Sequence, residues 1–187
     1  STEIGNDYWI AKGGSVGELY GYQSAGRYEV TDFNYDAVTE TWTLKEGVDD
    51  ATAVVGALRP GMMKLRDISG DNLISIADVS VIGNANPIHT GGFNIDGWFY
   101  GFDISAVFSW SYGNDIYNAN KVEYTTARYQ FRNMIDIMAD GKRWTNVDAN
   151  GVLVNDPATL ASMNSNTTMW SPYMTRHVFS DWAVEDG

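Results

Sequence analysis

The alternation of side chains from Phe102 to Tyr112 limits what this chain can fold into more than any other feature of the sequence. Every second residue is apolar and the residues between are mostly small and polar; the apolar set is Phe102, Ile104, Ala106, Phe108, Trp110 and Tyr112. A period of two sustained over this run predicts a β-strand with two unlike faces. A second, shorter alternation at residues 93–96 predicts a partner strand, and the run Gly97–Gly101 predicts the tight connection between the two.

Two structural classes fit these faces. A strand in the wall of a transmembrane β-barrel meets lipid on one side and water on the other, with aromatic residues at the membrane interface. A strand of a soluble β-sandwich also alternates. The 7 Trp, 11 Tyr, 7 Phe and 19 Gly favour β structure, and no stretch approaches the ~18 consecutive apolar residues of a transmembrane helix. Periodicity alone leaves both β classes open.

Other segments predict weaker elements. Residues 13–28 mix glycine with aromatic side chains and predict a strand with a turn at each end, and residues 29–43 predict a surface hairpin. Apolar residues at helical spacing predict a short helix within 116–138, and the polar stretch 139–172 is expected to be a long loop. No internal repeat divides the chain, so residues 1–187 are expected to form a single region.

Composition excludes several functions. The chain carries 12 Lys and Arg against 24 Asp and Glu, a formal net charge of −12, so it lacks the basic surface that nucleic acid requires. Without cysteine it can have no disulfide, thiolate nucleophile or cysteine zinc site. No nucleophile elbow and no distinctive spacing of carboxylates is present, so the chain is not expected to be an enzyme.

The run from Asp67 to Asp78 carries oxygen-bearing residues at the spacing of a twelve-residue calcium loop. The expected ligands are Asp67, Ser69, Asp71, Leu73 (through its backbone carbonyl), Ser75 and Asp78. Asn72 stands where such a loop has glycine, and asparagine tolerates left-handed backbone better than most residues. A turn without metal is the alternative. A bound calcium ion would stiffen the loop and would not perform chemistry.

Several longer stretches carry motifs in a definite order. They are GSVGELYGYQSAGRY (Gly14–Tyr28), RPGMMKLRDISGDNLISIADVSVIGNANP (Arg59–Pro87), GGFNIDGWFYGFDISAVFSWSYGNDIYN (Gly91–Asn118) and WAVEDG (Trp182–Gly187). In content and order they resemble motifs of the SusC/RagA family of TonB-dependent outer-membrane transporters. The resemblance implies an all-β fold: antiparallel strands and long extracellular loops from the C-terminal half of a transmembrane β-barrel, with a short helix in a loop.

The same resemblance implies the biological setting. The chain would be a partial barrel without the plug domain, located in the outer membrane of a Bacteroidetes-type bacterium and surrounded by outer-membrane lipid. The parent protein would take up nutrients, importing oligosaccharides or peptides. The TonB complex would act through the missing N-terminal part, and a SusD-like surface lipoprotein would form a lid.

Aromatic residues on loop-like stretches are the candidates for contact with substrate: Tyr35, Trp42, Trp144 and Trp170. Packing of these rings within their own loops is the alternative. A second hypothesis for the whole chain is a free-standing, secreted, calcium-stabilised β-domain that binds glycans. It accounts for the aromatic residues and the acidity but not for the order of the motifs.

Overall fold

The computed structural model of the chain describes all residues except 1, 4–8, 11, 130 and 174–175. The strands are β1 (Thr2–Glu3), β2 (Trp9–Ile10), β3 (Glu18–Gly21), β4 (Ser24–Arg27), β5 (Phe33–Asp36), β6 (Thr41–Leu44), β7 (Met63–Leu65), β8 (Ser80–Asn84), β9 (His89–Phe99), β10 (Phe102–Tyr112), β11 (Asp115–Tyr117) and β12 (Val184–Asp186). They pair antiparallel as β1–β2, β3–β8, β4–β7, β5–β6, β9–β10 and β11–β12. The predicted all-β class is confirmed, and the strands that the structure describes do not close into a barrel.

The helices are short. The α-helices are α1 (Thr52–Val55), α2 (Ala119–Glu123) and α3 (Pro157–Met163), and 3-10 turns occur at Val30–Asp32, Ile76–Asp78, Asp136–Met138 and Asp181–Ala183. In the described part of the chain, none of these helices has the length and apolar character needed to cross a membrane.

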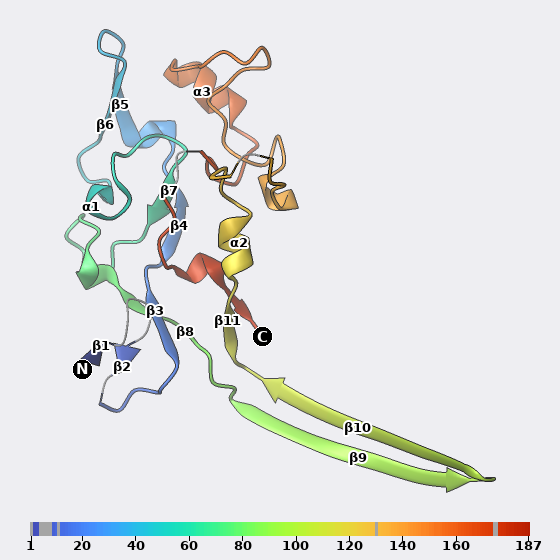
Figure 1. The fold of residues 1–187 in the computed structure, drawn as a ribbon. Coiled ribbons are helices and arrows are strands. Elements are labelled where there is room, and N and C mark those ends of the chain that lie inside the picture. Colours follow the sequence, from blue (N-terminus) through green and yellow to red (C-terminus); the bar gives the residue numbers. More distant parts are fainter. Residues whose placement is uncertain (1, 4–8, 11, 130, 174–175) are drawn as a thin grey trace.

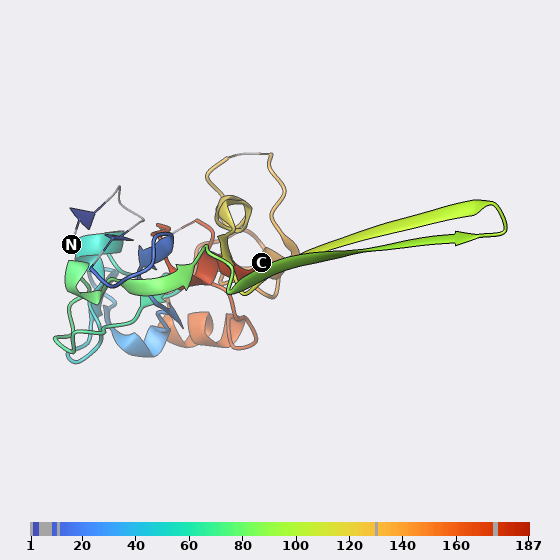
Figure 2. The ribbon, with the colours of Figure 1, turned by 90° about the horizontal axis from the view of Figure 1, so that it is seen from below.

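The β9–β10 hairpin projects away from the body formed by the other elements (Figures 1 and 2). Its strands pair without interruption from Phe99 opposite Phe102 to His89 opposite Tyr112. This register places most of the apolar residues of both strands on one face, where Phe93 stacks on Phe108 with ring centroids 4.7 Å apart, whereas Trp98 and Val107 lie on the other face. That face remains open: Ile104 is 63% exposed and Phe102 71% exposed.

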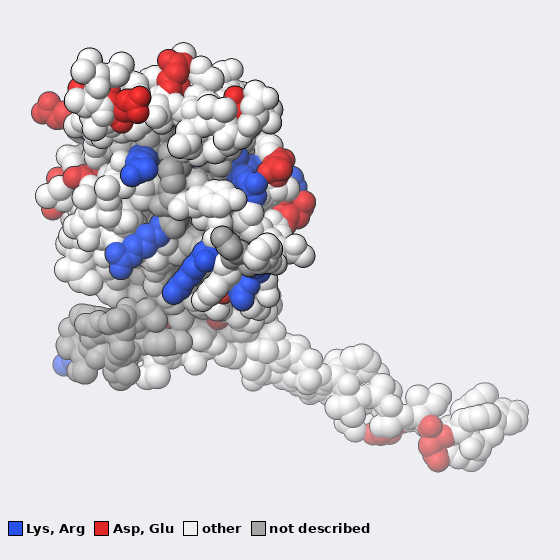
Figure 3. Space-filling model, turned by 45° about the horizontal axis from the view of Figure 1, so that its top comes forward, with Lys and Arg blue, Asp and Glu red and all other residues white. Residues whose placement is uncertain are grey.

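The opposite face of the hairpin is mainly polar. Asp96 lies opposite Ser105 and accepts a hydrogen bond from its hydroxyl at 2.7 Å. Asp96 and Asp103 are the only charged side chains between Thr90 and Tyr112. In the space-filling view the hairpin is accordingly almost free of charge except near its far end (Figure 3).

The turn of this hairpin is shorter than predicted. Gly97, Trp98 and Phe99 belong to β9, so the expected five-residue connection at Gly97–Gly101 is wrong and only Tyr100 and Gly101 join the strands. Both turn residues have positive φ, 48° and 84°, as in the two-residue turns that match the twist of paired strands.

The body is built around one apolar cluster. Its buried members are Tyr28, Phe33, Ala51, Val55, Leu58, Met62, Met63, Leu65, Ile74, Met138 and Trp170. The predicted hairpin within 29–43 is present as β5–β6, whereas the stretch 13–28 contains β3 and β4, which pair with the distant strands β8 and β7.

Two predictions about the second half meet different outcomes. The short helix predicted within 116–138 is present as α2, which starts after Asn118, whose side chain caps it by accepting from the Lys121 N–H at 3.0 Å; the apolar spacing near Met138 forms only the 3-10 turn at Asp136–Met138. The stretch 139–172 is not only loop, because it contains α3. Asp156 caps α3 by accepting from the Thr159 N–H at 2.8 Å, and Pro157 occupies the first turn.

Candidate ligand-binding site

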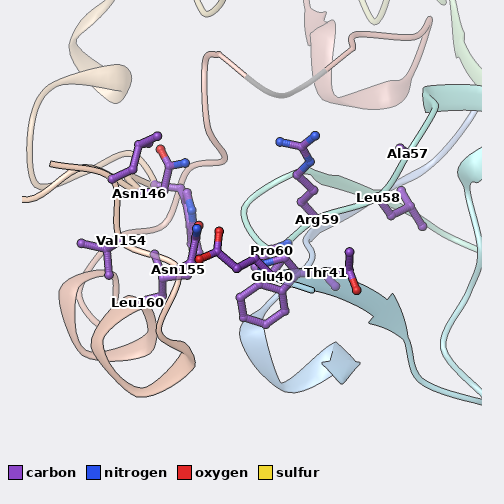
Figure 4. Close-up of a pocket in the computed structure, with 13 residues that line it drawn as sticks. Glu40, Thr41, Ala57, Leu58, Arg59, Pro60, Asn146, Val154, Asn155 and Leu160 are labelled. Atoms are coloured by element: carbon purple, nitrogen blue, oxygen red, sulfur yellow. The ribbon is translucent and has the colours of Figure 1, made fainter. Parts of the chain in front are cut away.

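A cleft of about 510 Å³ lies between the β5–β6 hairpin, the chain after α1 and the segment that carries α3 (Figure 4). Its buried apolar lining comes from Leu58, Pro60, Trp144 and Leu160. Its more exposed lining is polar and includes Glu40, Arg59, Asn146 and Asn155. An apolar interior with a few polar groups is typical of small-molecule sites, which have volumes of ~300–1,000 Å³.

Trp42 reaches the cleft at the end of a series of aromatic contacts that begins in the core. Tyr28 meets Phe33 edge-on at 5.8 Å, and Phe33 meets Trp42 edge-on at 6.2 Å. Tyr35, directly opposite Trp42 in the β5–β6 register, lies 4.5 Å from it. The Trp42 ring is therefore supported on two sides and remains half-buried at the edge of the cleft.

Trp144 is fixed more tightly. The guanidinium of Arg27 lies 5.0 Å from the centre of its ring, and the backbone N–H of Trp144 donates to the Met169 carbonyl at 2.9 Å. A Cβ at Gly61 would lie 2.3 Å from Cδ1 of Trp144. Gly61 also has a φ of +88°, so this position requires glycine for both its backbone and its contact.

Arg27, at the end of β4, binds the chain segment that follows α3. Its guanidinium donates to the Thr167 hydroxyl at 2.6 Å and to the Met169 carbonyl at 2.9 Å. Asn164, which is buried at the end of α3, accepts from the Thr145 N–H at 2.8 Å and donates to the Thr145 carbonyl at 2.8 Å. These bonds hold the chain around Trp144 and α3 against the sheet.

The polar side chains of the cleft have no such role. Within the described part of the chain, the side chains of Glu40, Arg59, Asn146 and Asn155 make no hydrogen bond or ion pair with protein groups. Figure 4 shows Asn146 and Asn155 on one side of the cleft and Glu40 and Arg59 on the other. Their hydrogen-bonding capacity is available to a ligand.

The predicted aromatic residues divide between two places. Trp42 and Trp144 line the cleft, and Tyr35 contacts Trp42 from outside it. Trp170 is buried in the core, 4.7 Å from Trp182. The polar residues of the cleft were not predicted, because they come from three separate loops and carry no motif.

The Asp67–Asp78 loop is held by its own carboxylates. Asp67 accepts from the N–H groups of Gly70 and Asn72, each at 2.7 Å, and Asp71 accepts from the Leu73 N–H at 2.9 Å. Asn72 has the expected left-handed conformation, with φ 61°. Ile74 anchors the loop in the core.

Asp78 is fully buried and receives three backbone N–H groups. Oδ1 accepts from Ile68 and Ser69, each at 2.9 Å, and Oδ2 accepts from Ser75 at 2.8 Å. Burial alone would raise the pKa of Asp78, but these hydrogen bonds outweigh it and lower the pKa to about 2. Among the described residues no three acidic or histidine side chains converge on one point, so calcium binding by Asp67, Ser69, Asp71, Leu73, Ser75 and Asp78 stays a prediction.

The chain resembles two curated proteins of Formosa agariphila. It is 30% identical to TonB-dependent receptor P3 over 61% of its own length and 28% identical to TonB-dependent receptor P39 over 59%. The chain is similar to these TonB-dependent receptors over about three fifths of its length. It spans only 10% and 12% of the lengths of these receptors, and no family model matches it. These matches support the resemblance to TonB-dependent receptors in general, while the narrower SusC/RagA assignment stays a prediction.

Proposed function

We propose that this chain is a segment of a TonB-dependent outer-membrane transporter of the SusC/RagA type, in which β9 and β10 form part of the barrel wall. The β9–β10 hairpin carries this proposal. Each strand has 11 residues, matching the ~9–11 residues of a strand that crosses the bilayer. One face is mostly apolar and open, and the other carries serine, threonine, asparagine and aspartate together with Trp98 and Val107.

Aromatic residues at both ends of the hairpin support the same arrangement. Phe99 and Phe102 lie next to the turn on the apolar face, and Trp110 and Tyr112 lie on the same face at the opposite end. Outer-membrane barrels carry such aromatic girdles at the two interfaces of the membrane. The spacing between the two groups is that of a single membrane crossing.

The turn length gives the proposed orientation. Outer-membrane barrels have short periplasmic turns and long extracellular loops. The two-residue turn at Tyr100 and Gly101 therefore belongs on the periplasmic side, and the body with its cleft belongs on the cell surface. There it would face the lid formed by a SusD-like lipoprotein and meet substrate, an oligosaccharide or a peptide, before TonB-driven import; the chain itself would have no enzymatic role.

The test is cysteine labelling of the hairpin in native outer membranes. Ile104→Cys and Phe108→Cys should react with a lipid-phase probe and not with an aqueous one, whereas Ser105→Cys and Ser109→Cys should show the opposite preference. The serine variants are the matched control, because their side chains lie on the same strand but on its opposite face. Equal aqueous labelling of both faces would contradict the proposal and favour the secreted glycan-binding domain.

A further inference from the structure

A second pocket, also of about 510 Å³, lies between the chain at the end of α2 and the segment that begins at the buried Pro172. The Ala127 N–H joins the two segments by donating to the Pro172 carbonyl at 3.0 Å. Residues that are far apart in the sequence therefore face one space. This pocket shares no lining residue with the cleft of Figure 4.

The charged side chains of this pocket are unequally satisfied. Glu123 is the only carboxylate among the described residues of the lining, and it is already paired with Arg132. Arg128 and Arg176 also line the pocket, and neither forms an ion pair within the described part of the chain. The ring of Tyr129 supports the Arg128 guanidinium at 5.5 Å, and a guanidinium held by its face keeps the N–H donors at its edge available.

The histidine of the lining adds no charge. His177 lies edge-on to Trp170 and stacked on Trp182, with ring centroids 5.9 Å apart in each pair. Burial lowers the pKa of His177 to about 4, so its imidazole is neutral at pH 7.5. The unpaired positive charge of the lining therefore comes from Arg128 and Arg176.

Two guanidinium groups match a doubly charged oxyanion better than a singly charged one. Each guanidinium can donate two parallel hydrogen bonds to neighbouring oxygens of a phosphate. A phosphate monoester carries a charge of about −1.5 to −2 at neutral pH and three strong acceptor oxygens, enough for both arginines. A carboxylate brings one charge and two oxygens, which leaves the second guanidinium without a full partner.

We propose that this pocket binds the phosphate group of a monoester, with Arg128 and Arg176 donating to its oxygens. The pocket is larger than a phosphate ion, and Val122, Pro172 and Tyr173 line the remaining space. Tyr173 is 73% exposed, so its ring has surface to bury against the group that carries the phosphate. This chemistry does not depend on the proposed transporter function. Only the source of the phosphate does, since a receptor in a membrane can take it from a lipid headgroup or from a dissolved monoester.

The experiment is isothermal titration of the full-length receptor that contains this chain, purified in detergent. The probe is phenyl phosphate at pH 7.5, compared with benzenesulfonate and benzoate, which carry a single charge on the same ring. We expect phenyl phosphate to bind about tenfold more tightly than either, and Arg128→Gln and Arg176→Gln each to weaken its binding about tenfold. Both arginines are exposed, so the fold should be unaffected. Arg128→Lys and Arg176→Lys keep the charge but lose the paired donors, and should recover only part of the affinity.

Arg66→Gln is the matched control, because Arg66 is exposed after β7 and lies outside the lining. It should leave the affinity unchanged. Glu123→Gln removes the negative charge of the lining and should not weaken binding. Equal affinities for the three probes, the same loss in Arg66→Gln as in Arg128→Gln, or no binding of phenyl phosphate would overturn the proposal. Weaker binding in Glu123→Gln with unchanged binding in the arginine variants would overturn it too.

Competition in vesicles assigns the source. The receptor is reconstituted in phosphatidylcholine containing either phosphatidic acid, whose headgroup is a phosphate monoester, or phosphatidylglycerol, an anionic diester. Weaker binding of phenyl phosphate beside phosphatidic acid supports the site with a lipid headgroup as its ligand, and equal binding supports it with a dissolved monoester. Membrane location is scored separately by the cysteine labelling of the hairpin. A receptor found outside the membrane removes the transporter proposal and the lipid source, but arginine-dependent binding of phenyl phosphate still supports the pocket.

Discussion

Asp78 is the residue whose loss should most disturb the Asp67–Asp78 loop. Asp78→Ala removes the carboxylate that accepts from the N–H groups of Ile68, Ser69 and Ser75. Each hydrogen bond to a charged group contributes ~1.5–3 kcal/mol, but the three share one acceptor and water can reach the freed groups near the surface. We therefore expect the free energy of local opening to fall by about 2–4 kcal/mol.

The same carboxylate should make the loop sensitive to acid. Its pKa in the folded protein is lowered from 3.8 to about 2, so its stabilising effect is complete above pH ~4 and is lost as the pH falls from about 4 through about 2. Asp78→Asn should remove this dependence. The substitution also turns an amide N–H₂ toward a backbone N–H, so part of the stability is lost with it.

Hydrogen exchange of the intact protein, followed by mass spectrometry on peptides covering residues 66–80, measures both effects. Exchange rates are corrected for their intrinsic dependence on pH. Asp71→Ala is the control, because Asp71 is exposed and accepts only from the Leu73 N–H among the described hydrogen bonds. Unchanged protection in Asp78→Ala, or an equal loss in Asp71→Ala, would refute the reasoning.

Three further predictions concern the cleft wall and the loop. Arg27→Ala should lower the free energy of unfolding of the body by about 2–3 kcal/mol, measured by denaturant titration, because it removes hydrogen bonds and the contact with Trp144; Arg27→Lys should recover only part of the loss. Gly61→Ala should cost about 2 kcal/mol or more in the same titration, since it clashes with Trp144 and strains a positive φ. Calcium should raise the melting temperature of the wild type and not that of the Asp67→Ala, Asp71→Ala double variant, and identical melting in calcium and chelator would exclude a calcium site.

The hairpin could be predicted because local pattern determines it. The alternation from Phe102 onward gives the strand and its two faces without knowledge of anything distant in the sequence. The turn was misplaced because glycine at position 97 suggested a loop, whereas the glycine lies inside β9 opposite Ile104. Glycine weakens a strand interior without ending it, and here the ladder continues through this position to Phe99.

The body was harder to predict because distant pairings determine it. β3 pairs with β8 and β4 with β7, and no local signal in residues 13–28 specifies those partners. Helix α3 is different, since Asp156 followed by Pro157 is a readable start signal that was overlooked within a polar stretch. Trp42 and Trp144 could be singled out as aromatic residues on loops, but their meeting in one cleft depends on Arg27 and Asn164, whose roles appear only in three dimensions.

The connection between hairpin and body bears on how the cleft would work. β8 leads into β9 and β10 leads into β11, and the base is closed where the Asp115 carboxylate accepts from the Asn84 N–H at 2.6 Å. β11 then pairs with β12 near the end of the chain. If the hairpin stands in the barrel wall, both of its strands continue directly into the body, so the body is held at two points and not on a single flexible tether. On the proposed function, the cleft would therefore keep a fixed position relative to β9 and β10.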